Sequence, residues 1–272
     1  MSDQQSASGA TGQPGGDQAP GDETDVAAED GATCDPANGD LAVDALLDGE
    51  MEIEGRMPWS SNATFLVTLR LGDATARGIY KPHRGERPLW DFPSGLWQRE
   101  VATYELAAFL GWNVIPRTVK RGGDFGLGSV QTFVDADFSQ QYFTILESLP
   151  DTHDQLRTLA TLDIIANNAD RKGGHVLIDG TNTIWGIDNG LCFHEEPKLR
   201  TVMWDFAGDM IPRRLRDDIE RLTDTAPGSL GALDELLDES EIDMMLKRAQ
   251  RILKKPTFPN PTSNYAYPWP LV

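Results

Sequence analysis

Apolar and polar residues alternate through the first half of the chain, as they do in β-strands that bury one face. This pattern predicts an antiparallel sheet whose strands are joined by polar or glycine-rich turns. The third strand should end at Lys81, because the proline that follows it cannot continue the ladder. The strand patterns are 51–59, 65–71, 77–82, 113–120 and 128–134.

One long helical pattern lies among these strands, at residues 98–111. Its apolar residues recur at helical spacing, and Gly111 is a typical C-cap. Glu100 falls in the first turn of this expected helix, where a carboxylate suits the helix dipole, so the dipole is one explanation for it. A shorter helix is expected at 41–49, closed by Gly49.

The second half of the chain is predominantly helical. A helix over 152–168 leads into the stretch Asn168–Asp188, which holds a loop, a short hairpin pattern and two aspartates, Asp170 and Asp188. Three further helices are expected at 213–222, 230–237 and 240–255. The last should begin with a capping box made by Ser240 and Asp243.

A β-rich half followed by an α-rich half predicts an α+β protein with two lobes and a cleft between them. We place the N-lobe, an antiparallel sheet with one main helix, at 41–135 and the mostly helical C-lobe at 136–256. Residues 257–272 should form a surface arm, and residues 1–40 a tail.

The tail differs from the rest of the chain in composition. It carries nine Asp or Glu residues and no Lys, Arg, Phe, Trp, Tyr or Ile, so it cannot bury enough apolar surface to fold, and we expect a disordered acidic segment. It can serve as a solubilising tail or as an acidic docking segment. The whole chain has a formal net charge of −19 and no basic stripe, which argues against nucleic-acid partners and against stable membrane association.

The sequence also favours a reducing compartment. Its start lacks the basic and apolar pattern of a secretory signal, and eighteen consecutive apolar residues occur nowhere. Cys34 lies in the tail and Cys192 beside Asp188, so a structural disulfide between them is not expected. We therefore expect a cytoplasmic protein, and a monomer.

The candidate chemistry is phosphoryl transfer. That reaction needs a cation on the phosphates, one or two Mg²⁺ ions held by oxygen ligands, and an aspartate beside the acceptor hydroxyl. Lys81, Asp170 and Asp188 occur in the order in which a two-lobed fold supplies these groups. The literal Asp-Phe-Gly triplet at 124–126 precedes the candidate catalytic loop, so we interpret it as turn residues of a hairpin.

These residues resemble a known superfamily. The run D-I-I-A-N-N-A-D-R-K-G-G-H is similar to the catalytic loop of phosphatidylinositol 3-/4-kinase-like and HipA-type kinases, with Asp163, Asn168, Asp170 and Arg171 in register. I-D-N-G resembles the family's metal loop, and Y-K-P and R-E-V-A-T-Y-E-L-A resemble its lysine strand and glutamate helix. The resemblance covers roughly residues 50–212. Within the superfamily, the chain most resembles an actinobacterial branch.

The resemblance implies a protein-kinase-like fold, ATP and Mg²⁺ as cofactors, and a role for each matching residue. Asp170 would be the catalytic aspartate, Asn168 would brace its loop, and Asp188 would be the main metal ligand. Lys81 would hold the α- and β-phosphates, with Glu100 orienting it. Phosphates would be covered by Ser60, Ser61 and Asn62, and adenine would meet the hinge at Phe133, Val134 and Asp135.

The chain departs from the family at His175, where the pattern has asparagine. Neutral imidazole offers a softer nitrogen ligand, better suited to Mn²⁺ or Zn²⁺ than to Mg²⁺. His175 could thus ligate another metal, bind phosphate as imidazolium, mark weakened turnover, or be a structural histidine bonded to backbone. A zinc site from His175, Cys192 and His194 has no recognisable spacing.

Three functions are compatible with this pattern. The first is an ATP-dependent phosphotransferase that acts on a protein or small-molecule hydroxyl, since residues 191–212 offer few cations for a phosphoinositide headgroup. The second is a nucleotide-binding pseudokinase with a regulatory or scaffold role, for which His175 is the sequence support. A metal hydrolase is the third, and it leaves Lys81 and Glu100 unexplained.

Overall fold

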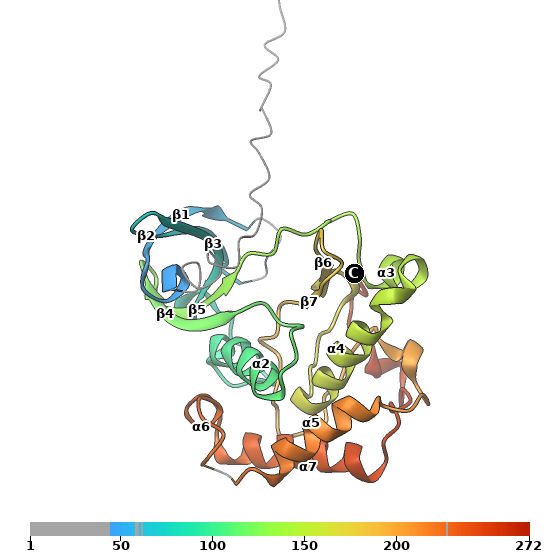
Figure 1. Cartoon of the computed structure of the whole chain (residues 1–272). Coiled ribbons are helices and arrows are strands. Elements are labelled where there is room, and N and C mark those ends of the chain that lie inside the picture. The colour runs from blue at the N-terminus through green and yellow to red at the C-terminus, as the bar shows by residue number, and fades with distance from the viewer. Residues whose placement is uncertain (1–43, 58–59, 61, 227) are drawn as a thin grey trace, which may run out of the picture. The chain divides into compact units, whose positions relative to one another are not determined.

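The computed structural model of the protein describes residues 44–57, 60, 62–226 and 228–272 (Figure 1). The expected tail at 1–40 and Ser61 lie outside the described residues. The chain divides into a unit at 1–35 and a unit at 36–272, and the second is described here by itself. Residues 44–48 are helical, so the described part of the helix expected at 41–49 has the predicted conformation.

The first half of this unit forms the predicted antiparallel sheet. Its strand order is β1-β2-β3-β5-β4, so β3, which carries Lys81, is central. On β3, Tyr80 faces Val130 of β5 and Lys81 faces Ser129, which fixes the register on that side. The strands are β1 (Glu50–Arg56), β2 (Phe65–Leu71), β3 (Ala74–Pro82), β4 (Thr118–Gly123) and β5 (Gly126–Thr132).

The Asp124-Phe125-Gly126 triplet lies at the turn of the β4–β5 hairpin, as predicted. Gly123 pairs with Gly126 across the turn, and Gly126 has a φ of 95°, a backbone conformation that favours glycine. The Tyr80 hydroxyl donates a hydrogen bond to the Gly126 carbonyl. The triplet is therefore part of the sheet and not of a metal loop.

The main helix of this half is α2 (Leu96–Leu110), and it begins two residues earlier than predicted. Glu86, in the loop after β3, accepts hydrogen bonds from the backbone N–H groups of Gly95 and Trp97 at 2.9 and 2.8 Å and so stabilises the helix start. Glu100 consequently lies beyond the first turn. The dipole explanation for this residue is wrong, because a buried carboxylate one turn into the helix does not meet its free N–H groups.

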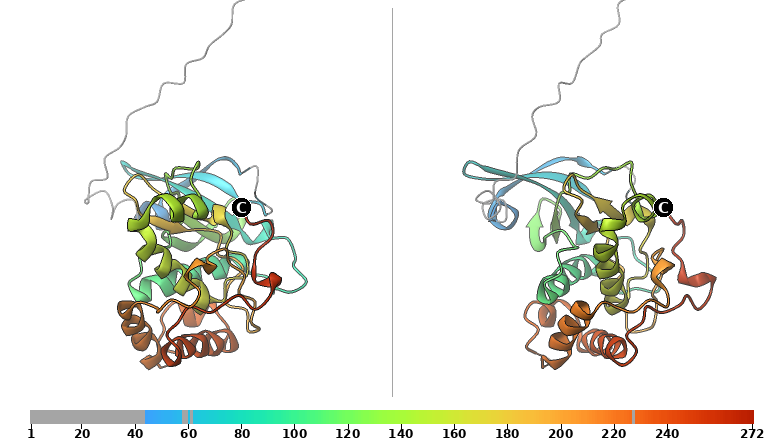
Figure 2. Two further views of the ribbon diagram at one scale, coloured as in Figure 1. Left: turned by 90° about the vertical axis from the view of Figure 1, so that its right-hand side faces the viewer. Right: turned by 45° about the vertical axis from the view of Figure 1, so that its right-hand side comes forward.

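The second half is predominantly helical and contains the larger hydrophobic core. That core joins α2 to the later helices, whereas a smaller cluster around Leu69 and Val130 lies within the sheet. In Figure 2, α5 and α7 lie at one end of this unit, the sheet lies at the other, and α2 and α4 lie between them. The elements are α3 (Tyr142–Ser148), α4 (His153–Ala166), β6 (Val176–Ile178), β7 (Ile184–Gly186), α5 (Arg213–Asp224), α6 (Leu233–Leu236) and α7 (Glu239–Lys254).

Several single-turn 3-10 helices punctuate this framework. They are η1 (His83–Gly85), η2 (Pro150–Thr152), η3 (Gly173–His175), η4 (Trp204–Phe206) and η5 (Asn264–Ala266). Of these, η3 matters most for the site, because it closes the loop that carries Asp170. Within the described residues, each helix is too short or too polar to cross a bilayer.

The predicted capping box of α7 is wrong by two residues. Asp238 is the N-cap, and its own backbone N–H donates to Glu241 Oε2 at 3.0 Å, which completes a box of Asp238 and Glu241. Ser240 instead donates its hydroxyl to Glu195, and Asp243 pairs with Lys247 one turn later. Asp238 and Glu241 have the same i, i+3 spacing as the predicted pair, and Ile242 and Met245 of the helix that they begin are buried.

We expect Asp238→Ala to lower the free energy of unfolding by about 1 kcal/mol, because it removes the side chain that caps α7. Asp243→Ala is the matched control and should cost less than about 0.5 kcal/mol, because it removes only an exposed i, i+4 ion pair. Urea denaturation monitored by circular dichroism measures both. Equal losses in the two variants, or a larger loss in the control, would contradict the assignment.

Candidate active site

Two cavities meet at the side chains of Lys81 and Asp188. The first has a volume of about 270 Å³ and lies between the sheet and the β6–β7 hairpin, and the second, of about 290 Å³, lies under the loop that joins β3 to α2. Both are lined by Lys81 and Asp188, and Ser60 and Thr64 border both as well. A ligand in the first cavity can therefore reach the second through this junction.

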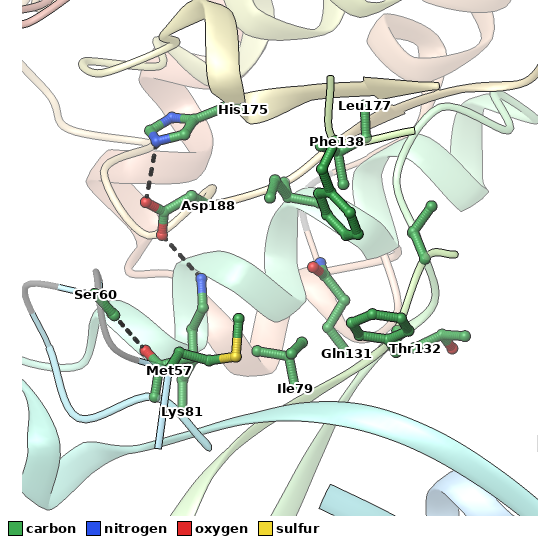
Figure 3. Close-up of a pocket in the computed structure, with 14 residues that line it drawn as sticks. Met57, Ser60, Ile79, Lys81, Gln131, Thr132, Phe138, His175, Leu177 and Asp188 are labelled. Atoms are coloured by element: carbon green, nitrogen blue, oxygen red, sulfur yellow. Dashed lines mark hydrogen bonds and ion pairs between the residues drawn. The ribbon is translucent and has the colours of Figure 1, made fainter. Parts of the chain in front are cut away.

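The first cavity has an apolar end and a polar end (Figure 3). Its apolar wall brings together side chains from the sheet, from the segment after β5 and from the β6–β7 hairpin. A flat aromatic group fits such a wall, and the polar end suits charged groups attached to it. The apolar lining residues are Met57, Ile79, Phe133, Val134, Phe138, Leu177 and Ile187.

Lys81 forms two ion pairs at the junction. Its Nζ lies 2.5 Å from Glu100 Oε1 and 2.9 Å from Asp188 Oδ1, so one ammonium connects β3, α2 and the loop after β7. Gly128 of the neighbouring strand makes room for the Lys81 backbone, because a Cβ at Gly128 would collide with the Lys81 carbonyl oxygen. Lys81 and Glu100 thus form the pair that the sequence predicted.

The three charges reinforce one another. Burial alone would lower the pKa of Lys81, but the carboxylates of Asp188 and Glu100 outweigh burial and raise this pKa above its ordinary value. The Lys81 ammonium in turn is the main cause that lowers the pKa of Asp188, with a smaller contribution from His175. Lys81 is therefore a cation and Asp188 a carboxylate at neutral pH.

Asp188 adopts a backbone conformation that is uncommon for residues other than glycine, although aspartate tolerates it better than most. Its φ is 59°, in the left-handed region, and its side chain is 53% exposed toward the cavities. The next residue, Asn189, is buried and donates its backbone N–H to Glu100 Oε2 at 3.0 Å. Glu100 thereby holds both Lys81 and the backbone beside Asp188, which maintains the strained position.

Arg171 is fully buried and connects the loop after α4 with the segment around Asp188. Its Nε and Nη2 donate to the two oxygens of Asp163, each at 2.9 Å, which is a bidentate pair. Nη2 also donates to Asn189 Oδ1 at 2.6 Å and Nη1 to the Ile187 carbonyl at 2.7 Å. One guanidinium thus positions both aspartate loops.

Asp170 lies at the edge of the second cavity, in the loop that Asn168 braces. Asn168 donates to Asp163 Oδ1 at 3.1 Å and accepts the backbone N–H of Asp170 at 2.9 Å, as the bracing role requires. Burial raises the pKa of Asp170 against the lowering effect of Lys172, whose Nζ lies 3.0 Å from Asp170 Oδ2. A raised pKa makes a carboxylate a better proton acceptor.

His175 uses its two ring nitrogens differently. Nδ1 lies 2.9 Å from the Asp170 carbonyl oxygen, to which only an N–H can donate, so Nε2 is the unprotonated nitrogen of the neutral ring. Nε2 faces Asp188 Oδ2 at 3.4 Å (Figure 3). Burial is the main cause that lowers the pKa of His175, which favours the neutral imidazole over a phosphate-binding imidazolium.

The donor set fits a metal that is held mainly by its phosphate partner. Among the described residues, three or more His, Cys, Asp or Glu side chains nowhere gather closely enough to hold a metal ion, so neither a zinc site at His175, Cys192 and His194 nor a complete protein cage is present. Mg²⁺ in phosphotransferases needs only one or two protein ligands, because phosphates and water supply the rest. Asp188 can supply one such ligand, and the free nitrogen of His175 can supply a second that suits Mn²⁺ better than Mg²⁺.

The remaining predicted residues lie mostly where expected. Ser60 lines both cavities and Asn62 the second, although the Ser60 hydroxyl is bonded to Thr64 and Asn62 accepts the Arg87 N–H. Phe133 and Val134 line the first cavity. Asp135 is exposed and does not line either cavity. The backbone N–H of Phe133 donates to the Arg77 carbonyl oxygen, so this N–H is not free to bind a nucleotide base. Ser61 lies outside the described residues.

Some residues of the site carry no local signal in the sequence. Glu86 holds α2 and Lys172 holds Asp170, yet each looks like an ordinary surface or loop residue in its own segment. Asn189 is part of the I-D-N-G stretch, but nothing local indicates that it holds Arg171. The motif contains Arg171 without giving it a role, and its pairing with Asp163 follows from the tertiary structure. The others become recognisable only when distant segments meet.

The last residues of the chain contact the candidate catalytic loop. The Leu271 carbonyl accepts the Gly173 N–H at 2.7 Å, and the chain end lies beside β6 and α3 in Figure 1. Further back, the Ala266 carbonyl accepts the N–H of Thr201 and the indole N–H of Trp204. The expected surface arm at 257–272 is thus hydrogen-bonded to the loop that carries Asp170.

These features define the class of protein. The fold is a kinase-like α+β fold. Its antiparallel sheet carries a lysine on the third strand, a helix bears the glutamate partner of this lysine, and the helical half presents two aspartate loops. The chain is 38% identical over 259 residues to protein Rv2133c of Mycobacterium tuberculosis. The match covers 83% of this chain and 93% of that protein. It belongs to the same family as that protein.

The solved structures that resemble the chain include two with low sequence identity. The Helicobacter pylori proinflammatory kinase CtkA is 12% identical with a TM-score of 0.44, over 78% of this chain and 94% of its own. Hydra Fam20, solved with sugar, is 10% identical with a TM-score of 0.48, over 79% and 87% of the two chains. The sequence matches no model of a protein family.

We expect Gly173→Ala to lower the free energy of unfolding by roughly 1–3 kcal/mol, because the new Cβ would overpack a closed contact. It would lie 2.6 Å from Gln141 Oε1, which caps α3, and 3.3 Å from Val272 Cγ2. Gly174→Ala is the control, since its Cβ would meet only Val272 Cγ1, at an ordinary 3.9 Å. Urea denaturation of both variants measures the difference, and equal stabilities would show that Gln141 and Val272 move aside to accommodate the added methyl group.

Proposed function

We propose that the protein is an ATP-dependent phosphotransferase that moves the γ-phosphate of ATP to a hydroxyl acceptor. The observation that carries this proposal is the Lys81 ammonium, held by Glu100 and Asp188 where an apolar cavity meets a polar one. A phosphotransferase needs such a junction, because adenine requires an apolar wall and the phosphates require a fixed cation.

Each residue then has a proposed role. Adenine would lie against Phe133 and Val134, and Lys81 would bind the phosphates beside Ser60. Asp188 and His175 would hold Mg²⁺ or Mn²⁺, which when bound neutralises phosphate charge. Asp170 would orient the acceptor hydroxyl and accept its proton, and its position in the second cavity suits this role.

The finer resemblance to phosphatidylinositol 3-/4-kinase-like and HipA-type kinases belongs to this proposal, as does the acceptor. We propose a protein or small-molecule hydroxyl rather than a phosphoinositide. Lys198, one of the few cations after the metal loop, is engaged with Asp91 at 3.3 Å and lies over the Phe92 ring. It is therefore not free to bind an anionic headgroup.

The proposed setting is the cytoplasm and the proposed state a monomer. The support for the cytoplasm is the sequence, which has only two cysteines. The described cysteine, Cys192, is a buried free thiol whose pKa is raised by burial to about 12, as expected of a structural cysteine in a reducing compartment.

A nucleotide-binding pseudokinase is the second candidate, and one observation favours it. Asp188 Oδ1 is already paired with Lys81 Nζ at 2.9 Å, and Lys81 is held in turn by Glu100. A metal would have to displace or share these contacts. In that case the protein would bind nucleotide and act as a regulator or scaffold without appreciable turnover.

Incubation with γ-labelled ATP separates the two candidates. The full chain is mixed with Mg²⁺ or Mn²⁺ and a lysate of its host, and label is followed into protein and small-molecule fractions. Transfer that depends on the protein supports the enzyme. Micromolar nucleotide binding without transfer supports the pseudokinase, and neither binding nor transfer would refute both.

Asp188→Ala should abolish metal-dependent ATP binding and reduce transfer by at least about a hundredfold, because it removes the principal metal ligand. The matched control is Asp124→Ala. Like Asp188, Asp124 lies two residues before a glycine, but it belongs to the β4–β5 hairpin. The control should keep full binding and activity. Isothermal titration calorimetry and the labelled-ATP assay measure both, and normal transfer by Asp188→Ala would sink the proposal.

His175→Asn tests the metal preference of the site. Asparagine offers a carbonyl oxygen in place of the imidazole nitrogen, so we expect the ratio of Mg²⁺- to Mn²⁺-supported ATP affinity to rise by roughly tenfold. Titration of ATP in each metal gives this ratio without requiring turnover. An unchanged ratio would mean that His175 is only the backbone-bonded structural residue.

A further inference from the structure

A third cavity lies apart from the candidate active site and shares none of its lining residues. It has a volume of about 660 Å³ and is formed by the C-terminal half of α7, the segment 195–199 and the arm residues 257–262. We call it the α7 cavity. Its size falls within the range of about 300–1,000 Å³ that is typical of small-molecule sites.

The floor of the α7 cavity is apolar and its rim is cationic. Three basic side chains at the end of α7 and just after it, Arg251, Lys254 and Lys255, border the cavity and are exposed. Among the described residues they form no ion pair within 4.0 Å with an acidic side chain. The apolar residues that line the cavity are Ile164, Leu199, Met244, Ile252 and Phe258.

This rim is unusual in so acidic a chain. The chain has a formal net charge of −19, yet residues 244–272 contain five Lys or Arg residues and no Asp or Glu. Glu195 also lines the cavity, and its Oε1 accepts a hydrogen bond from Ser240. Three unpaired cations against one carboxylate make the rim attractive to an anion.

Arg248 adds a buried, incompletely paired cation to the same wall. It is only 8% exposed, and it donates to the Ile165 carbonyl at 2.8 Å and to the His194 carbonyl at 3.3 Å. Its Nη2 is buried without a hydrogen-bond partner among the described residues. A buried guanidinium nitrogen without a partner is costly, so an anionic group brought close to it would gain more than one at an exposed arginine.

We propose that the α7 cavity binds an amphipathic anion, that is, an acyl or alkyl chain ending in a carboxylate or phosphate group. The apolar floor takes the chain, and Arg251, Lys254 and Lys255 take the head group. A purely polar anion would leave the floor in contact with water, and a neutral chain would leave the cations unused. This binding does not depend on nucleotide or on phosphoryl transfer.

Isothermal titration calorimetry of the full chain with laurate and with dodecyl phosphate, both below their micelle concentrations, tests the proposal. We expect saturable binding of one molecule per chain to at least one of them. Octanoate should bind at least about tenfold more weakly than laurate, because it is four methylenes shorter. Dodecyltrimethylammonium, which has the same chain and the opposite charge, should not bind at this site.

Two variants localise the binding. Arg251→Gln/Lys254→Gln/Lys255→Gln should weaken laurate binding on the order of tenfold by removing the rim charges. Met244→Trp should weaken it by filling the floor while it leaves the charges in place. Lys247→Gln is the control, since Lys247 lies on the same helix, pairs with Asp243 and is outside the lining. Thermal unfolding of each variant verifies that it is folded.

Several outcomes would overturn the proposal. These are no saturable binding of either anion, equal binding of the cationic amphiphile, and unchanged binding in both the triple variant and Met244→Trp. Flotation with phosphatidylglycerol vesicles provides a further arm. Binding to vesicles without binding of the free amphiphiles would identify a membrane-facing surface and not a small-molecule site.

Discussion

The structure of the site depends on one buried guanidinium. Arg171 is enclosed by protein, and a buried charge is tolerable only when it is paired and its donors are satisfied. Asp163 supplies the counter-charge, while Asn189 and the backbone of residue 187 accept the remaining hydrogen bonds. The helix α4, the loop with Asp170 and the segment with Asp188 must therefore keep fixed positions, because any displacement would leave a desolvated cation without partners.

A second set of charges connects this core to the sheet. Glu100 is 3% exposed, so its carboxylate needs both Lys81 and the Asn189 N–H to offset the loss of water. The same contacts keep Asp188 in a left-handed conformation with its carboxylate toward the cavities. Stability and candidate chemistry are thus coupled: the residues that bury charge at this junction also position the exposed one.

His175 places a ring nitrogen beside the carboxylate of Asp188. The backbone carbonyl of Asp170 fixes the ring tautomer, so His175 presents an unprotonated ring nitrogen and not a second positive charge. Two residues before His175, the backbone N–H of Gly173 donates a hydrogen bond to the Leu271 carbonyl oxygen. The groups that the loop 170–175 presents to a ligand therefore depend on the tautomer of His175 and on the contact of this loop with Leu271.

From the sequence alone we predicted the principal helices and most of the sheet, because periodicity and turn residues act locally, and the motif keeps Lys81, Glu100, Asp170 and Asp188 in order. The strand expected at 113–120 is displaced, since β4 runs over Thr118–Gly123. Local signals failed where two choices were nearly equal: Asp238 and Ser240 could both cap α7, and the helix begins after Asp238. Tertiary structure alone placed Glu86 and Leu271 at the site and paired Asn189 with Arg171, since the partners lie far away in sequence. It also assembled the α7 cavity from three separate segments. Such contacts follow from satisfying buried charge and filling space across the whole fold, which no local pattern records.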